Sequence, residues 1–119
     1  MSSIRNYVHL LGNIGEDPKV TKLDSGKKVA RFSLATNENY KDSNGDKQQR
    51  TDWHTIVAWG KTAEIVEEYA HKGKQVAVVG KLKTRTYTEP KEGHERRVTE
   101  VIADEILLLG SKSDKEAAN

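Results

Sequence analysis

The 119-residue sequence has a length that suits one domain with a single hydrophobic core. It contains no cysteine, which excludes a disulfide framework and a thiolate metal site and suits a reducing compartment. The charge balance of 20 Lys and Arg against 18 Asp and Glu gives a net charge of +2, and this total alone predicts no polyanionic partner.

Nothing in the sequence indicates a targeting or membrane-spanning segment. The first six residues, MSSIRN, lack the apolar stretch of a signal peptide. The longest apolar run, ILLL at residues 106–109, is far shorter than a bilayer requires. We therefore expect a cytoplasmic protein with no membrane partner.

The first half of the chain predicts β-strands separated by turns. Alternating apolar and polar residues indicate strands over residues 6–13, 19–23, 29–36 and 50–59. Residues 37–50 are polar and predict a loop, with Asn44-Gly45 as a two-residue hairpin turn at its tip. In the fourth strand, the period of two places Trp53, Thr55, Val57 and Trp59 on one face.

The second half predicts one helix followed by two long strands. Residues 62–72 carry Ala63, Val66 and Ala70 on one helical stripe, and Gly73 is suited to end the helix. A strand over residues 74–88 and a last strand over residues 96–109 flank a hairpin loop. Gly80 predicts a bend or bulge within the first of them.

The strand over residues 74–88 separates two kinds of side chain. One face is apolar toward its start and is expected to be buried; it carries Val76, Val78, Leu82 and Thr84. The opposite face carries Lys81, Lys83, Arg85 and Tyr87. Residues 70–88 contain five Lys and Arg and no Asp or Glu, so the positive charge is local.

This order of elements predicts an all-β protein. A five-stranded OB-fold barrel with one short α-helix between the third and fourth main strands accounts for it best. An open α+β sheet and an SH3-like barrel are the alternatives. We expect residues 1–110 to form the barrel domain and residues 111–119 to be a short, disordered polar tail.

Aromatic rings and cations on one sheet face provide what a single-stranded nucleic acid needs, namely stacking surfaces for bases and charges for phosphates. Tyr40 and Tyr87 lie close to the two hairpin tips, Tyr40 with Lys41 and Arg50 and Tyr87 with Arg85. The competing interpretation is that both Trp residues are core and that the cations only solubilise the surface.

An enzyme is not expected. The Asp residues are scattered over turns and show no cluster that would hold a metal ion, and no cofactor motif is present. Asp52 and His54 share a face, which would allow a general base with an orienting carboxylate. A histidine at a strand or subunit contact is the better interpretation.

Several segments resemble bacterial-type single-stranded DNA-binding proteins in the order found in that family. They are LGNIGEDP at residues 11–18, VARFSLAT at 29–36, TDWH at 51–54, GKTAEI at 60–65, YAHKG at 69–73 and GKLKTR at 80–85. Each is weak alone, but together they are specific and cover nearly all of residues 4–110.

The resemblance implies an OB-fold that assembles as a homotetramer and binds single-stranded DNA without reading its sequence, in the cytoplasm with the nucleoid. It implies roles in DNA replication, repair and recombination. The stacking aromatics implied are Tyr40, Trp53, Trp59 and Tyr87. The phosphate-contacting residues implied are Arg5, Arg31, Lys61, Lys72, Lys83 and Arg85. His54 is implied at a subunit interface.

The chain also departs from the family pattern. Tyr stands at 40 and 87 where Trp is more usual, Trp stands at 59 in place of Phe, and Thr55 occupies a position that often carries a base. The family's acidic C-terminal tip with a terminal Phe is lacking, so the sequence resembles a short form and tip-dependent protein partners are not expected.

Two other functions remain open at this point. One is an OB-type replication-restart subunit or RNA-binding module that uses the same face. The other is a protein-docking module whose aromatics bind another protein.

Overall fold

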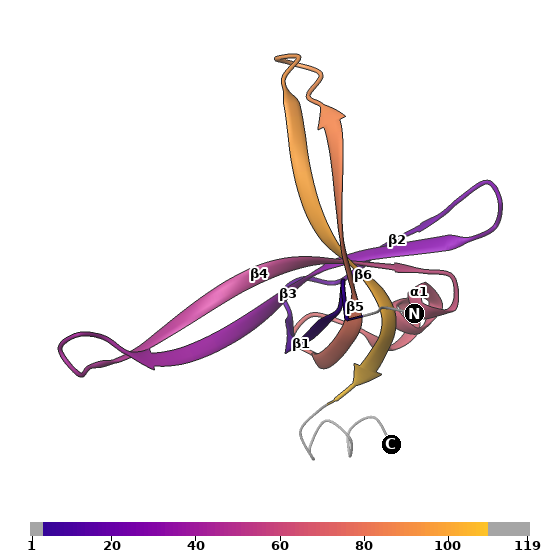
Figure 1. The fold of residues 1–119 in the computed structure, drawn as a ribbon. Coiled ribbons are helices and arrows are strands. Elements are labelled where there is room, and N and C mark those ends of the chain that lie inside the picture. Colours follow the sequence, from indigo (N-terminus) through magenta and orange to yellow (C-terminus); the bar gives the residue numbers. More distant parts are fainter. Residues whose placement is uncertain (1–3, 110–119) are drawn as a thin grey trace.

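Six strands and one helix make up residues 4–109, the part of the chain that the computed structural model describes (Figure 1). The elements are β1 (Val8–Ile14), β2 (Lys19–Lys22), β3 (Lys28–Lys41), β4 (Lys47–Trp59), α1 (Lys61–Tyr69), β5 (Gln75–Thr88) and β6 (Glu95–Leu108). The tail expected at residues 111–119 lies outside the described residues.

The sheet closes into a barrel. Its strand order is β1-β5-β6-β4-β3-β2, and a further pairing of β1 with β3 closes the five main strands while β2 extends β3 on the outside. This is the OB-fold predicted from the sequence, with the helix after the third main strand. The pairing of β4 with β6 is parallel, at Ile56–Val101 and Val57–Ile102, whereas the other strand pairs are antiparallel. β4 and β6 are distant in sequence and meet only because the barrel closes.

Barrel closure depends on a close approach of two backbones at Gly12. A Cβ atom at this position would lie 2.1 Å from the carbonyl oxygen of Ala35, and the next residue, Asn13, pairs with Ala35. Gly12 lies within β1, inside the strand predicted over residues 6–13, and the absence of a side chain there lets β1 contact β3.

The core is a single cluster inside the barrel. The alternating residues Ala30, Phe32 and Leu34 of β3 are buried in it, and Ala63 and Val66 attach α1 to it. Within residues 4–109 no helix is long and apolar enough to cross a membrane.

The helix is shorter than predicted at its C-terminal end. It stops at Tyr69, and the backbone N–H of Ala70 donates to the carbonyl of Val66. Gly73, with φ of 87°, therefore does not terminate the helix; it lies in a separate turn that the Lys74 N–H closes by donating to the His71 carbonyl.

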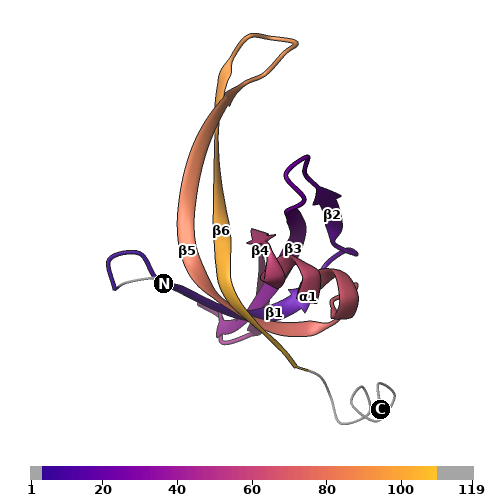
Figure 2. The same cartoon turned by 90° about the vertical axis from the view of Figure 1, so that its right-hand side faces the viewer.

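Two long hairpins, β3–β4 and β5–β6, project from the barrel in different directions (Figures 1 and 2). Most of residues 37–50 are thus paired strand rather than the predicted loop, with Asn37 opposite Thr51 and Lys41 opposite Lys47. The paired segments of residues 37–50 are polar on both faces because both faces meet solvent. The apolar alternation that indicates a strand is therefore missing there.

The tip of the β3–β4 hairpin also differs from the predicted two-residue turn. Asp42 and Asp46 pair around a three-residue connection, and the Gly45 N–H donates to the Asp42 carbonyl. Gly45 has φ of 82°, whereas Asn44 has no positive φ. The connection is therefore a type I turn followed by a glycine in the left-handed conformation. The Asp42 carboxylate accepts from the N–H groups of Asn44 and Asp46.

Gly80 marks the bend of β5, as predicted. The register with β6 shifts between Val79 and Gly80, and a Cβ on Gly80 would lie 2.1 Å from the carbonyl oxygen of Ile102. Beyond this bulge the hairpin leaves the barrel. Leu82 and Thr84 are consequently exposed, and the expectation that they form a buried face with Val76 and Val78 is wrong.

We predict that Gly12→Ala prevents proper closure of the barrel. The added methyl group would overlap the backbone of β3, and an unavoidable overlap with backbone should lower the free energy of unfolding by about 3 kcal/mol or more. Urea denaturation measures the change. Gly26→Ala is the control, because its site is open but has φ of 91°, so a loss of only about 1–2 kcal/mol is expected there. Equal losses in the two variants would contradict the closure argument.

Candidate nucleic-acid interface

The outer side of the barrel forms a continuous face from β5 to β3. Residues opposite one another in adjacent strands project to the same side, so the register traces the face. Lys83 of β5 lies opposite Glu100 of β6, and Val57 of β4 lies opposite both Ile102 of β6 and Arg31 of β3. Because Glu100 and Ile102 share a side of β6, all five residues belong to one face.

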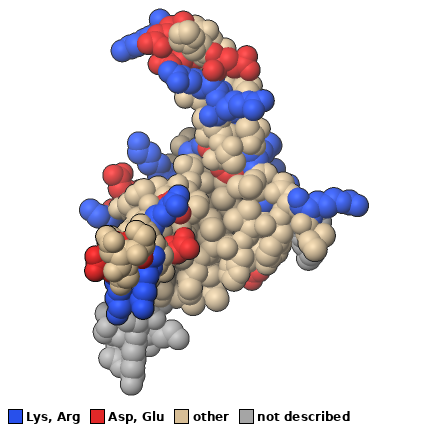
Figure 3. All heavy atoms as spheres, turned by 60° about the vertical axis from the view of Figure 1, so that its left-hand side comes forward, with Lys and Arg blue, Asp and Glu red and all other residues tan. Residues whose placement is uncertain are grey.

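The predicted aromatic and cationic stretches therefore lie on the same face. Trp53 and Trp59 share the side of Val57 on β4, and Arg85 and Tyr87 share the side of Lys83 on β5. Lys and Arg side chains lie on both projecting hairpins, while uncharged residues cover much of the surface between them (Figure 3).

All four predicted stacking residues are exposed. The exposed fractions are 48% for Tyr40, 62% for Trp53, 46% for Trp59 and 44% for Tyr87, which rules out the interpretation that both Trp side chains are core. The indole of Trp53 lies against the backbone of Gly15, where a Cβ would come within 2.4 Å of the ring. Gly15 thus makes room for an exposed aromatic ring.

Val57 departs from the expected exposed face. It lies on the same side as the two Trp residues but is only 1% exposed. β4 has neighbours on both sides here, and the longer side chains of Arg31 and Ile102 flank the short valine. The face therefore exposes aromatic rings at Trp53 and Trp59 but not the valine side chain between them.

The six predicted phosphate-contacting residues are all exposed; they are Arg5, Arg31, Lys61, Lys72, Lys83 and Arg85. Lys61 begins α1 just after Trp59. The Lys72 N–H donates to the Asp17 carboxylate at 2.8 Å, which holds it beside the end of β1. Arg5 precedes Asn6, whose side chain bonds both backbone groups of Leu82 and so ties the N-terminal segment to β5.

Tyr40 lines an open groove of about 640 Å³ on the β3–β4 hairpin. The lining residues are Asn39, Tyr40, Lys41, Lys47, Gln48 and Gln49. Arg50 was expected beside Tyr40, but it lies opposite Glu38 and pairs with Asp52 at 3.4 Å. The second cation of this groove is Lys47, which was not predicted because the polar residues 37–50 carry no strand pattern.

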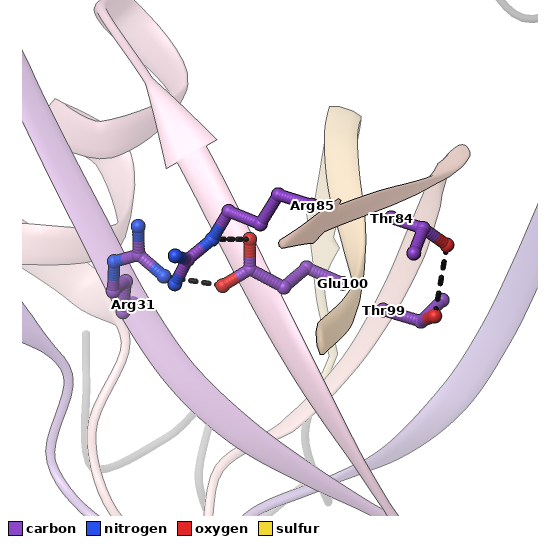
Figure 4. Close-up of polar contacts among 5 residues, drawn as sticks. All are labelled: Arg31, Thr84, Arg85, Thr99 and Glu100. Atoms are coloured by element: carbon purple, nitrogen blue, oxygen red, sulfur yellow. Dashed lines mark hydrogen bonds and ion pairs between the residues drawn. The ribbon is translucent and has the colours of Figure 1, made fainter. Parts of the chain in front are cut away.

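Glu100 is the buried charge at the centre of the face. It is 5% exposed, and it accepts hydrogen bonds from Arg85 Nε at 3.1 Å and from Arg31 (Figure 4). Burial raises the pKa of the Glu100 carboxyl group, but the hydrogen bonds from Arg85 and Arg31 outweigh burial and hold the pKa below its ordinary value of 4.5. Glu100 is not among the residues predicted from the sequence, although an acid among the apolar residues of 98–103 is a signal of a buried ion pair.

His54 and Asp52 do not form the imidazole–carboxylate pair considered above. His54 Nε2 lies 2.9 Å from Thr36 Oγ1, whereas Asp52 pairs with Arg50. Among residues 4–109, no group of three or more His, Asp or Glu side chains is arranged to hold a metal ion. The face thus offers rings and cations, which suit binding of a flexible polyanion with exposed bases.

Comparison with known proteins agrees with this chemistry. The model of the single-strand binding protein family matches residues 5–109. The chain is 45% identical over 107 residues to single-stranded DNA-binding protein 1 of Chlorobaculum tepidum, a match that covers 90% of this chain and 66% of that protein. It is 42% identical over 115 residues to the single-stranded DNA-binding protein of Bacteroides thetaiotaomicron, covering 95% of this chain and 71% of the relative.

Two solved structures share the fold. The Plasmodium falciparum SSB in complex with ssDNA superposes with a TM-score of 0.80 at 33% identity, covering 92% of this chain and 98% of the other. A deletion mutant of the single-stranded DNA binding protein from Thermus aquaticus superposes with a TM-score of 0.78 at 24% identity, covering 91% of this chain and 52% of the other.

We predict that Glu100 makes the stability of the protein depend on pH. Because its pKa is lowered by folding, its contribution is complete above the ordinary value of 4.5 and is lost as the pH falls through the folded-state pKa. At pH 7, Glu100→Gln should lower the free energy of unfolding by about 1–3 kcal/mol. The difference between the two proteins should shrink below pH 4.5, as measured by urea denaturation. A difference that stays constant from pH 7 to pH 3 would contradict this account.

Proposed function

Because this chain belongs to the single-strand binding protein family, we propose that it binds and protects single-stranded DNA without reading its base sequence. The observation that carries the proposal is the continuous outer face that joins exposed aromatic rings to Lys and Arg side chains across four strands. The relatives named as single-stranded DNA-binding proteins and the SSB structure with ssDNA support it.

We assign base stacking to Tyr40, Trp53, Trp59 and Tyr87. A ring that stacks on a base contributes about 1–3 kcal/mol and accepts every base, because each base has a π-face. The spacing of these rings over two hairpins and the barrel wall favours a strand that runs along the surface rather than one that enters a pocket.

We assign phosphate contacts to the six exposed basic residues predicted from the sequence, of which Arg31, Lys83 and Arg85 lie on the face. Each contact releases condensed counterions, so the logarithm of the affinity should fall linearly with the logarithm of salt concentration. The residues are Arg5, Arg31, Lys61, Lys72, Lys83 and Arg85.

We further propose a non-enzymatic role in DNA replication, repair and recombination, in the cytoplasm with the nucleoid. The relatives are named as binding proteins, and the face carries binding rather than catalytic chemistry. The chain spans 66% of the length of its Chlorobaculum relative, so these roles are proposed for the domain described and not for a longer protein.

A homotetramer is the proposed assembly. Leu11 of β1 and Leu107 of β6 are more than half exposed and lie in one row with Ala77 of β5, giving an exposed apolar patch. β5 pairs with one edge of β1, and on the opposite edge, within residues 4–109, only Asn13 and Ile14 pair with β3, so the rest of that edge, Val8–Gly12, is available to a second copy. We place His54 near a subunit contact.

Replacing Trp53 by Ala should weaken binding of oligo-dT by about 1–3 kcal/mol, because one stacking ring is lost. A titration followed by tryptophan fluorescence measures the wild-type affinity and should show quenching, while filter binding compares the variants. Tyr69→Ala is the matched control, since Tyr69 is an exposed aromatic on α1 outside the face.

The competing functions give different results in the same experiment. Equal losses for Trp53→Ala and Tyr69→Ala would contradict the stacking assignment. Tighter binding of oligo-rU than of oligo-dT would indicate an RNA-binding module. Absence of salt-dependent binding to either oligonucleotide would contradict the proposed function.

Leu11→Glu should dissociate the assembly, because it places a charge in the apolar patch of the proposed subunit contact. Sedimentation velocity at micromolar concentration should show tetramers for the wild type and smaller species for the variant. Ile65→Glu is the control, since Ile65 is an exposed apolar residue on α1 and its replacement should leave the tetramer intact. A wild-type protein that sediments as a monomer would contradict the proposed assembly.

A further inference from the structure

Glu100 is the one charged side chain that is buried among residues 4–109. A buried carboxylate is stable only when it is paired and hydrogen-bonded. Here its Oε1 accepts from Arg85 Nε and its Oε2 accepts from the Arg31 guanidinium, so each oxygen serves a different arginine (Figure 4).

The two arginines come from strands that are not neighbours. The order β5-β6-β4-β3 places Arg85 on one side of β6 and Arg31 two strands away on the other side. Arg31 therefore reaches across β4, beside the buried Val57, to meet Glu100. The carboxylate links the base of the β5–β6 hairpin to the barrel wall.

The same contact orients a proposed stacking residue. With Nε of Arg85 bonded to Glu100, its guanidinium carbon lies 5.8 Å from the centre of the Tyr87 ring, a cation–π distance. Both arginine side chains stay about 45% exposed. A guanidinium has five N–H donors, so each still has donors to offer a ligand after bonding Glu100.

We propose that Glu100 is a positioning residue of the nucleic-acid interface, which fixes Arg31 on the barrel wall and Arg85 beside Tyr87 and cancels one of their two positive charges. The inference deepens the proposed function and rests on it. The phosphate backbone then meets these two arginines as one net positive charge in a fixed geometry. Glu100 thus reduces the electrostatic contribution to the affinity, and it keeps the two arginine side chains in a fixed orientation.

The charge part is tested by the salt dependence of oligo-dT binding. Glu100→Gln removes the negative charge at nearly constant shape, so one more phosphate can be neutralised, and the slope of log affinity against log salt should steepen by about 0.7. Glu105→Gln is the matched control. It makes the same charge change on the same strand. Glu105 is exposed and lies opposite Val79, in the part of β5 that precedes the bulge. Equal slopes for the two variants would overturn the charge cancellation.

The positioning part is tested by Glu100→Asp. The charge is kept, but the shorter side chain cannot reach both arginines, so the slope should stay that of the wild type while the affinity falls two- to tenfold at every salt concentration. An affinity equal to that of the wild type would overturn positioning. Thermal melting establishes that each variant is folded at the temperature used for binding.

If Glu100→Gln does not fold, the charge is tested from the arginine side. Arg31→Gln leaves Glu100 and Arg85 as a neutral pair, so the slope should fall by about 0.7, and adding Arg85→Gln together with Glu100→Gln, which leaves no buried charge unpaired, should change it no further. A second decrease of the same size would overturn the cancellation. A wild-type protein that does not bind oligo-dT contradicts the proposed function itself, whereas the outcomes above concern only Glu100.

Discussion

Two contacts of backbone against backbone, at Gly12 and at Gly80, determine the shape on which every other feature depends. At each position a side chain would overlap a carbonyl group of a neighbouring strand, Ala35 at Gly12 and Ile102 at Gly80. The first contact lets β1 reach β3 and close the sheet, and the second lets β5 bend away from the barrel through a bulge. Closure removes most of the open edges of the sheet and leaves an inside for the core and an outside for binding.

The binding face follows from the register that closure imposes. A slip of one residue between β4 and β6 would turn Val57 away from Ile102 and would place Trp53 and Trp59 on the core side. The apolar residues Ile56 and Ala58, which alternate with these positions, hold the register because they must stay in the core. Packing inside the barrel thus determines which side chains meet the solvent on its outer face.

The sequence was informative where side chains alternate against one buried face. The alternation over residues 29–36 predicted β3, and Ala63 and Val66 predicted α1, because burial selects for their spacing. The same period of two predicted that Trp53 and Trp59 share one face of β4.

Sequence patterns failed where no face is buried or where the contact is tertiary. The arms of residues 37–50 are polar on both faces, so Lys47 was placed in a loop. The pairing of Glu100 with Arg31 and Arg85 joins three strands whose relative positions no local pattern specifies.

The projecting arms of the β3–β4 hairpin have a further consequence for energetics. From residue 37 to residue 50 their side chains bury almost no apolar surface, so ladder hydrogen bonds open to solvent hold most of this segment. Such segments open locally at a free energy well below that of global unfolding. A polymer lying along the groove of Tyr40 would have to order this hairpin, and the conformational entropy lost there would reduce the observed affinity. In exchange, the hairpin can adapt its course to strands of different sequence and curvature.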